Sequence, residues 1–265
     1  VCVGITPFNF PAMIPLWMFP LALVCGNTFV LKPSERVPLT AIRLTELLLE
    51  AGLPKGVFNL LHGGRETVDA LLRHPLVKAV SFVGSTPVAR HVYTTAAAHG
   101  KRVQANGGAK NYLVVLPDAD ASKTVEAVMN AAFGCAGDRC MAGSSVVTVG
   151  DRGRKVLPDL VAAARALTVG RTDVESQPGM GAVITAAHRD RVRNLVDRGE
   201  RDGARVIADG RDVKVADAPN GFFLGATLVE GTPTRLNRLM AGGALDVSVV
   251  SAVEYARDSA RYLLL

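Results

Sequence analysis

Apolar runs alternate with helical patterns along the first hundred residues. Residues 1–5 and 28–32 are rich in apolar residues, and a proline-punctuated apolar stretch at 11–24 separates them. Residues 38–51 place leucines at helical spacing before a glycine, which is typical of an amphipathic helix and its stop. The same patterns predict strands at 57–61 and 78–83 and helices at 67–73 and 87–98. Strands that alternate with helices at this pitch predict a Rossmann-like, doubly wound parallel α/β sheet.

The pattern changes after Gly107 and Gly108, and a second α/β layer is expected to begin near Ala109. A loop of small residues at 134–143 carries two cysteines. Around this loop the pattern predicts strands at 112–116, 145–149 and 205–208, helices at 121–133, 156–167 and 186–199, and a strand followed by a helix within 247–264.

Composition narrows the class of protein. The 265 residues are 49% hydrophobic and 20% charged, a globular composition that excludes a disordered tail or a fibre. The net charge of +6 is scattered along the chain, whereas nucleic-acid binding needs a concentrated basic face. The first 31 residues are uncharged but contain four prolines, so we expect a buried core segment and not a membrane span.

The four cysteines form no Cys-x-x-Cys pair, which favours a reduced, cytoplasmic setting. We expect Cys2, Cys25 and Cys135 to be buried core thiols. Cys140 stands beside Arg139 in the glycine-rich loop, where a cysteine can be reactive; a fourth buried thiol is the alternative. The five histidines show no metal-ligand spacing and offer Cys140 no evident partner base, so no metal site is predicted.

Three loops follow predicted strands, where ligands sit in parallel sheets. They cover Thr6–Pro11, Lys32–Glu35 and Gly84–Pro87. The last opens a helix with a glycine and a capping hydroxyl at Ser85, which suits a phosphate, although a plain helix cap is the alternative. An acid just past the second strand suits ribose hydroxyls, although Lys32 and Glu35 could equally form a solvated turn.

Four motifs in order carry a family resemblance: Thr-Pro-Phe-Asn-Phe-Pro at 6–11, Leu-Lys-Pro-Ser-Glu at 31–35, Phe-Val-Gly-Ser-Thr at 82–86 and Gly-Asp-Arg-Cys at 137–140. Together they resemble the aldehyde dehydrogenase superfamily over about residues 1–230. Residues 7–20, with Val-Gln-Ala-Asn at 103–106 and Arg-Cys-Met at 139–141, resemble its CoA-acylating methylmalonate-semialdehyde dehydrogenases most closely.

The resemblance implies that the Cys140 thiolate attacks an aldehyde and that the Asn9 side chain and the Cys140 backbone N–H hold the oxyanion. Hydride transfer to NAD would then leave a thioester on Cys140. The resemblance also implies cofactor contacts: Lys32, Glu35 and Arg36 at the adenosine ribose, Gly84 and Ser85 at the pyrophosphate, and Thr6, Phe8 and Gly107 at the nicotinamide half. Because Glu35 occupies space that a 2′-phosphate needs, NAD is favoured over NADP.

Asn106 is the informative departure from most of the superfamily, which has Glu there as the base that activates water. An amide accepts no proton near neutral pH, so coenzyme A is expected as the acyl acceptor. The resemblance then implies oxidation of methylmalonate or malonate semialdehyde to propionyl-CoA or acetyl-CoA. Arg139 would clamp the substrate carboxylate, with an ion pair to Asp138 as the alternative. The relatives usually have Gln at position 138.

Superfamily members are nearly twice this long. The resemblance therefore implies an NAD-binding domain at 1–108 lacking its N-terminal portion and a catalytic domain at 109–265 incomplete at its C-terminus. The Glu-Glu-Ile-Phe-Gly-Pro segment expected after Glu230 is replaced by the different sequence at 238–246. Two alternatives stay open: a non-acylating aldehyde dehydrogenase, and a catalytically incomplete NAD-binding remnant. The resemblance implies a homo-oligomer for full-length members but does not extend that expectation to this chain. No nucleic-acid or membrane partner is expected.

Overall fold

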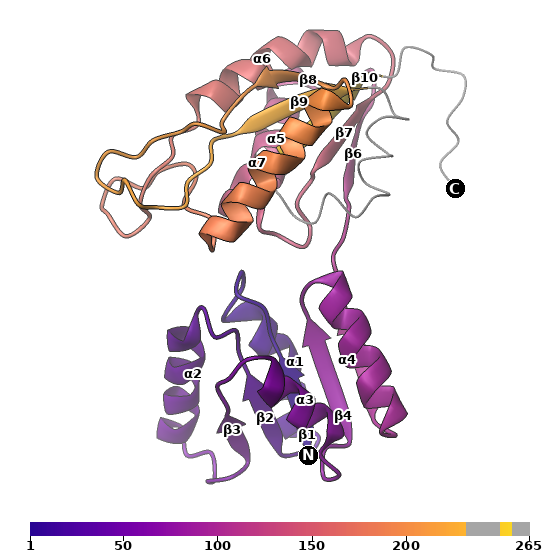
Figure 1. Cartoon of the computed structure of the whole chain (residues 1–265), viewed down its shortest axis with the longest axis vertical. Helices are drawn as coiled ribbons and strands as arrows, with labels where there is room; N and C mark the ends of the chain where they lie inside the picture. The colour runs from indigo at the N-terminus through magenta and orange to yellow at the C-terminus, as the bar shows by residue number, and fades with distance from the viewer. Residues whose placement is uncertain (232–249, 256–265) are drawn as a thin grey trace. The chain divides into compact units, whose positions relative to one another are not determined.

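The computed structural model describes residues 1–231 and 250–255 (Figure 1). It divides the chain into two compact units, Val1–Gly108 and Ala109–Leu265. Each unit has its own five-stranded sheet.

The first unit alternates strands and helices as the sequence predicts. Its sheet has the order β3-β2-β1-β4-β5, and every neighbouring pair is parallel. The elements are β1 (Cys2–Ile5), α1 (Met13–Val24), β2 (Phe29–Lys32), α2 (Pro38–Glu50), β3 (Phe58–Leu60), α3 (Arg65–Arg73), β4 (Ala79–Val83), α4 (Thr86–Ala98) and β5 (Arg102–Asn106).

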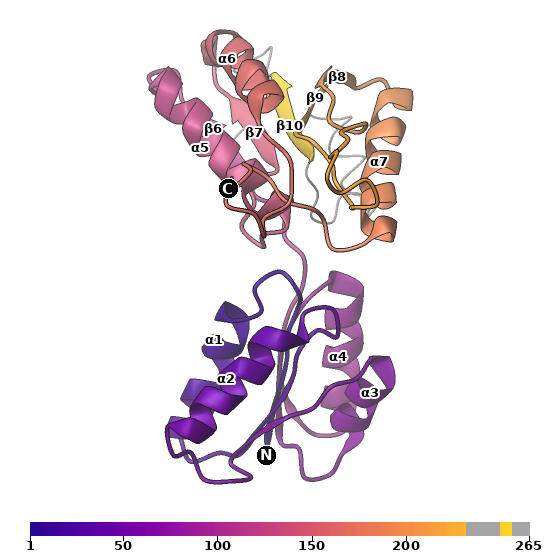
Figure 2. The same cartoon turned by 90° about the vertical axis from the view of Figure 1, so that its left-hand side faces the viewer.

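Helices cover both faces of this sheet, α1 and α2 on one side and α3 and α4 on the other (Figure 2). On the first face Phe19 of α1 packs edge-on against Phe58 of β3, with ring centroids 4.9 Å apart. On the second, Leu72 and Val92 are fully buried in a cluster with Val80 of β4. Apolar side chains on both faces explain why the central strand β1 is apolar along its whole length, and they confirm the doubly wound fold.

Strand β5 was not predicted from the sequence. Its residues alternate between exposed Arg102, Gln104 and Asn106 and half-buried Val103 and Ala105. Among the strands that the structure describes, it pairs with β4 alone, at the edge of the sheet, and its alternate side chains meet water. The period-two alternation is the signal that could have revealed it.

The second unit contains a mixed sheet of order β6-β7-β10-β9-β8. Its pairs are parallel except β8 with β9, which is antiparallel and irregular between Val206 and Ala208. The elements are β6 (Tyr112–Val115), α5 (Ala121–Phe133), η1 (Gly134–Gly137), β7 (Ser145–Thr148), α6 (Arg152–Ala166), α7 (Ala186–Arg201), β8 (Arg205–Ala208), β9 (Thr227–Gly231) and β10 (Val250–Tyr255).

Strand β9 was also not predicted, although it pairs with β10 and β8 in the sheet. Strand β10 supplies the strand expected within 247–264, between β7 and β9. The helix expected after it, and the divergent segment 238–246, lie outside the described residues. Buried side chains of α5, α6 and α7, among them Val128, Leu160 and Val196, form one core with Leu228 of β9.

The prediction that three cysteines are buried was wrong for two of them. Cys25 and Cys135 are exposed and Cys2 is half-buried. Cys25 follows the last turn of α1 at its exposed end, and Cys135 lies in a backbone turn with positive φ. The apolar character of cysteine was therefore not enough to predict whether these thiols are buried.

None of the described helices combines the length and apolar character that crossing a membrane requires. Within the same residues, His, Cys, Asp and Glu side chains form no group of three that could hold a metal ion.

Candidate active site

The chain segments singled out in the first unit meet at one edge of its sheet. Thr6 follows β1, Lys32 ends β2, Gly84 follows β4 and Asn106 ends β5. Ile5 is in register with Lys32, and because all the strands are parallel, their carboxyl ends lie at the same edge. The chain runs outward from β1 to β2 and β3 and then returns to place β4 on the other side of β1. This change of direction is the switch point at which open α/β sheets bind ligands.

Lys32 and Glu35 form a defined pair at this edge. The Lys32 ammonium donates to Glu35 Oε2 at 3.0 Å, with the lysine side chain 6% and the glutamate side chain 57% exposed. A hydrogen bond from its own backbone N–H, together with the Lys32 ammonium, lowers the pKa of the Glu35 carboxyl against a smaller opposing effect of burial. The carboxylate is therefore ionised at neutral pH and open to a ligand. Arg36 next to it is exposed.

Thr6 presents a buried hydroxyl at the switch point. The residue is 4% exposed, and its N–H donates to the carbonyl of Lys32 at 3.1 Å. Within residues 1–231 and 250–255, its hydroxyl oxygen has no hydrogen-bond partner. A buried hydroxyl without a partner is costly, so this group is suited to a ligand. Phe8 and Asn9, further along the same loop, are half-buried.

The loop before α4 differs in one detail from the prediction. Ser85 is the N-cap residue, but its hydroxyl makes no capping hydrogen bond. Instead the Thr86 hydroxyl accepts from the N–H of Gly108 at 2.9 Å, which joins the start of α4 to the segment after β5. Gly107 lies close against Thr86: a Cβ at Gly107 would come within 3.1 Å of that hydroxyl. Thr86 was not predicted from the sequence because its partner, Gly108, follows the neighbouring strand and lies 22 residues away in the chain.

The cysteine loop of the second unit has an unusual backbone. Cys135, Ala136 and Gly137 take positive φ angles of 53°, 54° and 74° in succession. The first two are not glycines, so each costs roughly 1–2 kcal/mol relative to an ordinary conformation. The predicted loop 134–143 thus begins with a tight turn, η1, and such strain persists only where the surroundings hold it.

Asn111 is one of the groups that hold this loop, and it was not predicted. Its side-chain amide donates to the carbonyl of Cys140 at 2.9 Å and to that of Ala142 at 3.1 Å. Cys140 itself is half-buried. In the described part of the chain, no acceptor is found for the Cys140 backbone N–H. A fixed thiol next to an available N–H is what attack on a carbonyl and stabilisation of its oxyanion require.

Arg139 and Asp138 precede Cys140 and point to different partners. The Arg139 guanidinium donates to the carbonyl of Asn130 at 3.4 Å and lies over Gly134, where a Cβ would be 2.4 Å from Nη2. Asp138 is buried, and its carboxylate lies 3.4 Å from Nε2 of His188 on α7. His188 is thus a side chain that the structure places beside Asp138, and the sequence did not indicate it.

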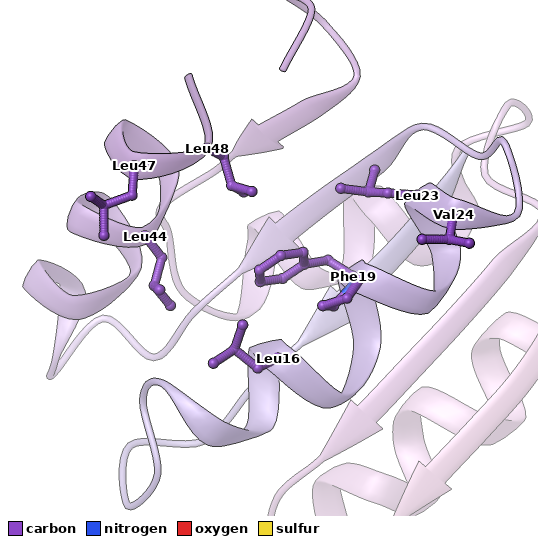
Figure 3. A pocket seen from close by; sticks show the side chains of 8 residues that line it. Leu16, Phe19, Leu23, Val24, Leu44, Leu47 and Leu48 are labelled. Carbon is purple, nitrogen blue, oxygen red and sulfur yellow. The ribbon is translucent and has the colours of Figure 1, made fainter. Parts of the chain in front are cut away.

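A groove on the first unit offers no comparable chemistry. It lies between α1 and α2 (Figure 3) and has a volume of about 400 Å³. Its lining is entirely apolar: Leu16, Phe19, Pro20, Leu23, Val24, Leu44, Leu47 and Leu48. A reaction site needs a few convergent polar groups, so this groove is not the candidate site.

Comparison with known proteins supplies independent information. The family model described as "Aldehyde dehydrogenase family" matches residues 1–240. Malonate-semialdehyde dehydrogenase 1 of Oceanobacillus iheyensis is 54% identical over 230 residues, which are 87% of this chain and 47% of that protein. The chain therefore spans about half the length of the curated relatives it matches.

Two solved structures are similar along most of the chain. Methylmalonate-semialdehyde dehydrogenase of Oceanimonas doudoroffii is 47% identical, with a TM-score of 0.89, and the match covers 97% of this chain and 53% of that one. A Sinorhizobium meliloti structure named as a methylmalonate-semialdehyde dehydrogenase complexed with NAD is 45% identical, with a TM-score of 0.89 and a coverage of 97% and 52%. With its family motifs in register, the chain belongs to the aldehyde dehydrogenase family.

Proposed function

We propose that the protein carries out NAD-dependent oxidation of methylmalonate or malonate semialdehyde to an acyl-CoA through a thioester on Cys140. The observation that carries the proposal is the Cys140 loop, in which Asn111 fixes the carbonyl of the cysteine and the cysteine N–H has no acceptor among the described residues. The names of the similar proteins support this substrate class.

The chemistry begins at the Cys140 sulfur. The thiolate attacks the aldehyde carbon, a C–S bond forms, and the carbonyl electron pair moves to oxygen. The Cys140 N–H donates to that oxyanion, with the Asn9 amide as the second donor that the family resemblance implies. One such donor typically contributes about 3–4 kcal/mol to lowering the barrier. When the oxyanion collapses, the carbon loses a hydride and becomes a thioester.

The residues at the carboxyl edge of the first sheet fit a dinucleotide. Thr6 has a buried hydroxyl without a partner among the described residues, and Ser85 leaves its hydroxyl out of the helix cap. When bound, NAD would accept the hydride from the thiohemiacetal carbon. Lys32, Glu35 and Arg36 would hold the adenosine ribose, Gly84 and Ser85 the pyrophosphate, and Thr6, Phe8 and Gly107 the nicotinamide half.

The preference for NAD would come from Glu35. Its carboxylate is held ionised by its own backbone N–H and by Lys32 and is accessible, so it can accept hydrogen bonds from ribose hydroxyls but repels a 2′-phosphate. Glu35→Gln should weaken NAD binding and narrow the difference between NAD and NADP, measured as the two dissociation constants.

The acyl acceptor follows from Asn106 at the exposed end of β5. Its amide cannot take a proton from water near neutral pH, whereas a thiol reaches its nucleophilic form far more readily. Coenzyme A would attack the thioester carbon, and the Cys140 thiolate would leave. For propionyl-CoA or acetyl-CoA to result, the substrate carboxylate also departs as CO₂ and a proton is taken up. Arg139 would bind that carboxylate beforehand.

The test measures NADH formation by the purified chain from malonate semialdehyde, with and without coenzyme A, with Cys140→Ser as the control. CoA-dependent turnover that disappears in the variant is the expected result. Acid production without coenzyme A would instead indicate a non-acylating aldehyde dehydrogenase. NAD binding without any turnover, in a folded sample, would contradict the proposal and leave a nucleotide-binding remnant.

A further inference from the structure

A buried carboxylate stands two residues before the proposed nucleophile. Asp138 is 6% exposed, and its N–H donates to the carbonyl of Cys135 at 2.9 Å. Its backbone therefore closes the left-handed turn that leads to Cys140. Placing a carboxylate away from water is expensive unless a cation or hydrogen-bond donors compensate its charge.

The side chain beside this carboxylate comes from a distant part of the chain. His188 Nε2 lies 3.4 Å from Asp138 Oδ1, with the two side chains 17% and 8% exposed. Both atoms are buried, and the contact between them does not have the geometry of a hydrogen bond. His188 belongs to the first turn of α7, and its N–H donates to the hydroxyl of the N-cap residue Thr185 at 3.1 Å. The imidazole is thus carried by a capped helix and not by a loose loop.

These contacts connect the strained turn to a rigid element. Two non-glycine residues before Asp138 have positive φ, a conformation that persists only when neighbouring groups enforce it. Asn111 holds the end of the loop at Cys140 and Ala142. The Asp138–His188 pair holds its beginning.

We propose that His188 is a positioning residue for the nucleophile: by pairing with Asp138 it keeps the turn, and so the Cys140 thiol, in the reactive geometry. The inference rests on the proposed function only in taking Cys140 as the nucleophile. It assigns no contact between His188 and the substrate. It also accounts for the acid at position 138, because the second member of the pair is present on α7.

The experiment measures the rate at which iodoacetamide alkylates Cys140, which needs no aldehyde, NAD or coenzyme A. Trypsin separates the two loop cysteines because it cleaves after Arg139, so mass spectrometry follows each thiol. His188→Gln should lower the Cys140 rate about tenfold or more, because a displaced loop changes the access and the thiolate character on which alkylation of a cysteine depends. Adding Asp138→Asn should restore most of the rate, since the double variant buries a neutral amide beside position 188 in place of a carboxylate.

The control is Arg193→Gln on the same helix. Arg193 pairs with Asp212 at 2.8 Å, and the Asp212 side chain is largely exposed, so this variant should leave the alkylation rate of Cys140 unchanged. The proposal is overturned if His188→Gln alkylates at the wild-type rate, or if the two substitutions reduce the rate additively without rescue, as lost packing alone would. If His188→Gln does not fold, we expect the double variant with Asp138→Asn to fold and its Cys140 to be alkylated. A double variant that does not fold, or whose Cys140 is not alkylated, would also overturn the proposal. A chain with normal alkylation but no turnover would contradict the proposed function and leave this inference standing.

Discussion

The two units build their candidate groups in different ways. In the first, Thr6, Lys32 and Gly84 each lie directly at the carboxyl end of a strand, so the parallel sheet alone brings them to one edge. In the second, Cys140 lies in a strained loop that Asn111 and the Asp138–His188 pair hold from other elements. The first arrangement follows from local sequence plus topology, and the second requires specific long-range contacts. Substitutions should therefore be tolerated differently in the two units.

The strongest separation of the two units comes from Cys140→Ser. A serine hydroxyl is a much weaker nucleophile than a thiolate near neutral pH, so aldehyde-dependent NADH formation should fall by at least about 10³-fold. The dissociation constant for NAD should stay within about twofold, because the proposed dinucleotide contacts belong to the first unit. Steady-state assays measure the rate of NADH formation, and calorimetric titration measures the dissociation constant for NAD. A parallel loss of NAD affinity would contradict this independence.

Asn111→Ala should show how far the loop depends on a remote side chain. Losing two hydrogen bonds to half-buried carbonyls should lower the free energy of unfolding by about 1–3 kcal/mol, and it should slow Cys140 alkylation. The matched control is Asn27→Ala in the first unit, because Asn27 also donates to a carbonyl, that of Ala22 at 3.2 Å, but is exposed. We expect its effect to be under about 0.5 kcal/mol in denaturant titrations. Equal losses would mean that Asn111 is not special.

A smaller effect tests the strain in the turn. Cys135→Gly should stabilise the protein by about 0.5–1 kcal/mol. Glycine removes the cost of a φ of 53°, and this gain is larger than the loss from the greater entropy of glycine in the unfolded chain. Cys25→Gly is the control, since Cys25 is also exposed but has an ordinary φ of −79°. It should be neutral or slightly destabilising in thermal and denaturant unfolding. Stabilisation of both variants alike would show that the turn is not strained.

The smallest expected effect concerns Glu35. Because folding lowers the pKa of its carboxyl, its contribution to stability is present at neutral pH and is lost as the pH falls through the lowered pKa, below the ordinary value of about 4.3. The carboxylate is more than half exposed, so solvent limits this contribution to at most about 0.5 kcal/mol. Glu35→Gln and the wild type should therefore differ slightly in unfolding free energy at pH 7 and converge once the pH is below the lowered pKa of Glu35. A difference that persists in acid would point to another cause.

Much of the first unit could be predicted because its elements are encoded locally. The strands β1, β2 and β4 are apolar on both faces, and helices with clear stops separate them, so their order and parallel direction followed from the pattern. Strand β5 was missed because its exposed alternate residues resemble a loop. Ser85 was correctly placed at a helix start, but the hydrogen bond there belongs to Thr86 and Gly108, which local sequence does not relate.

In the second unit the sequence identified the Cys140 loop and Arg139, but not what holds them. Asn111 and His188 looked ordinary because a hydrogen bond or ion pair between segments far apart leaves no periodic trace. The exposure of Cys135 depends on a backbone angle that its residue type disfavours.

By itself, the sequence determined the alternation of strands and helices, the loops at their carboxyl ends and the family to which they belong, because these features depend on side-chain periodicity and contiguous motifs. Only the tertiary structure decided which groups compensate the buried Asp138, which amide fixes the carbonyl of Cys140 and which hydroxyls lack partners among the described residues. Those outcomes depend on burial and on distances of a few ångströms between remote segments, which exist only once the chain has folded.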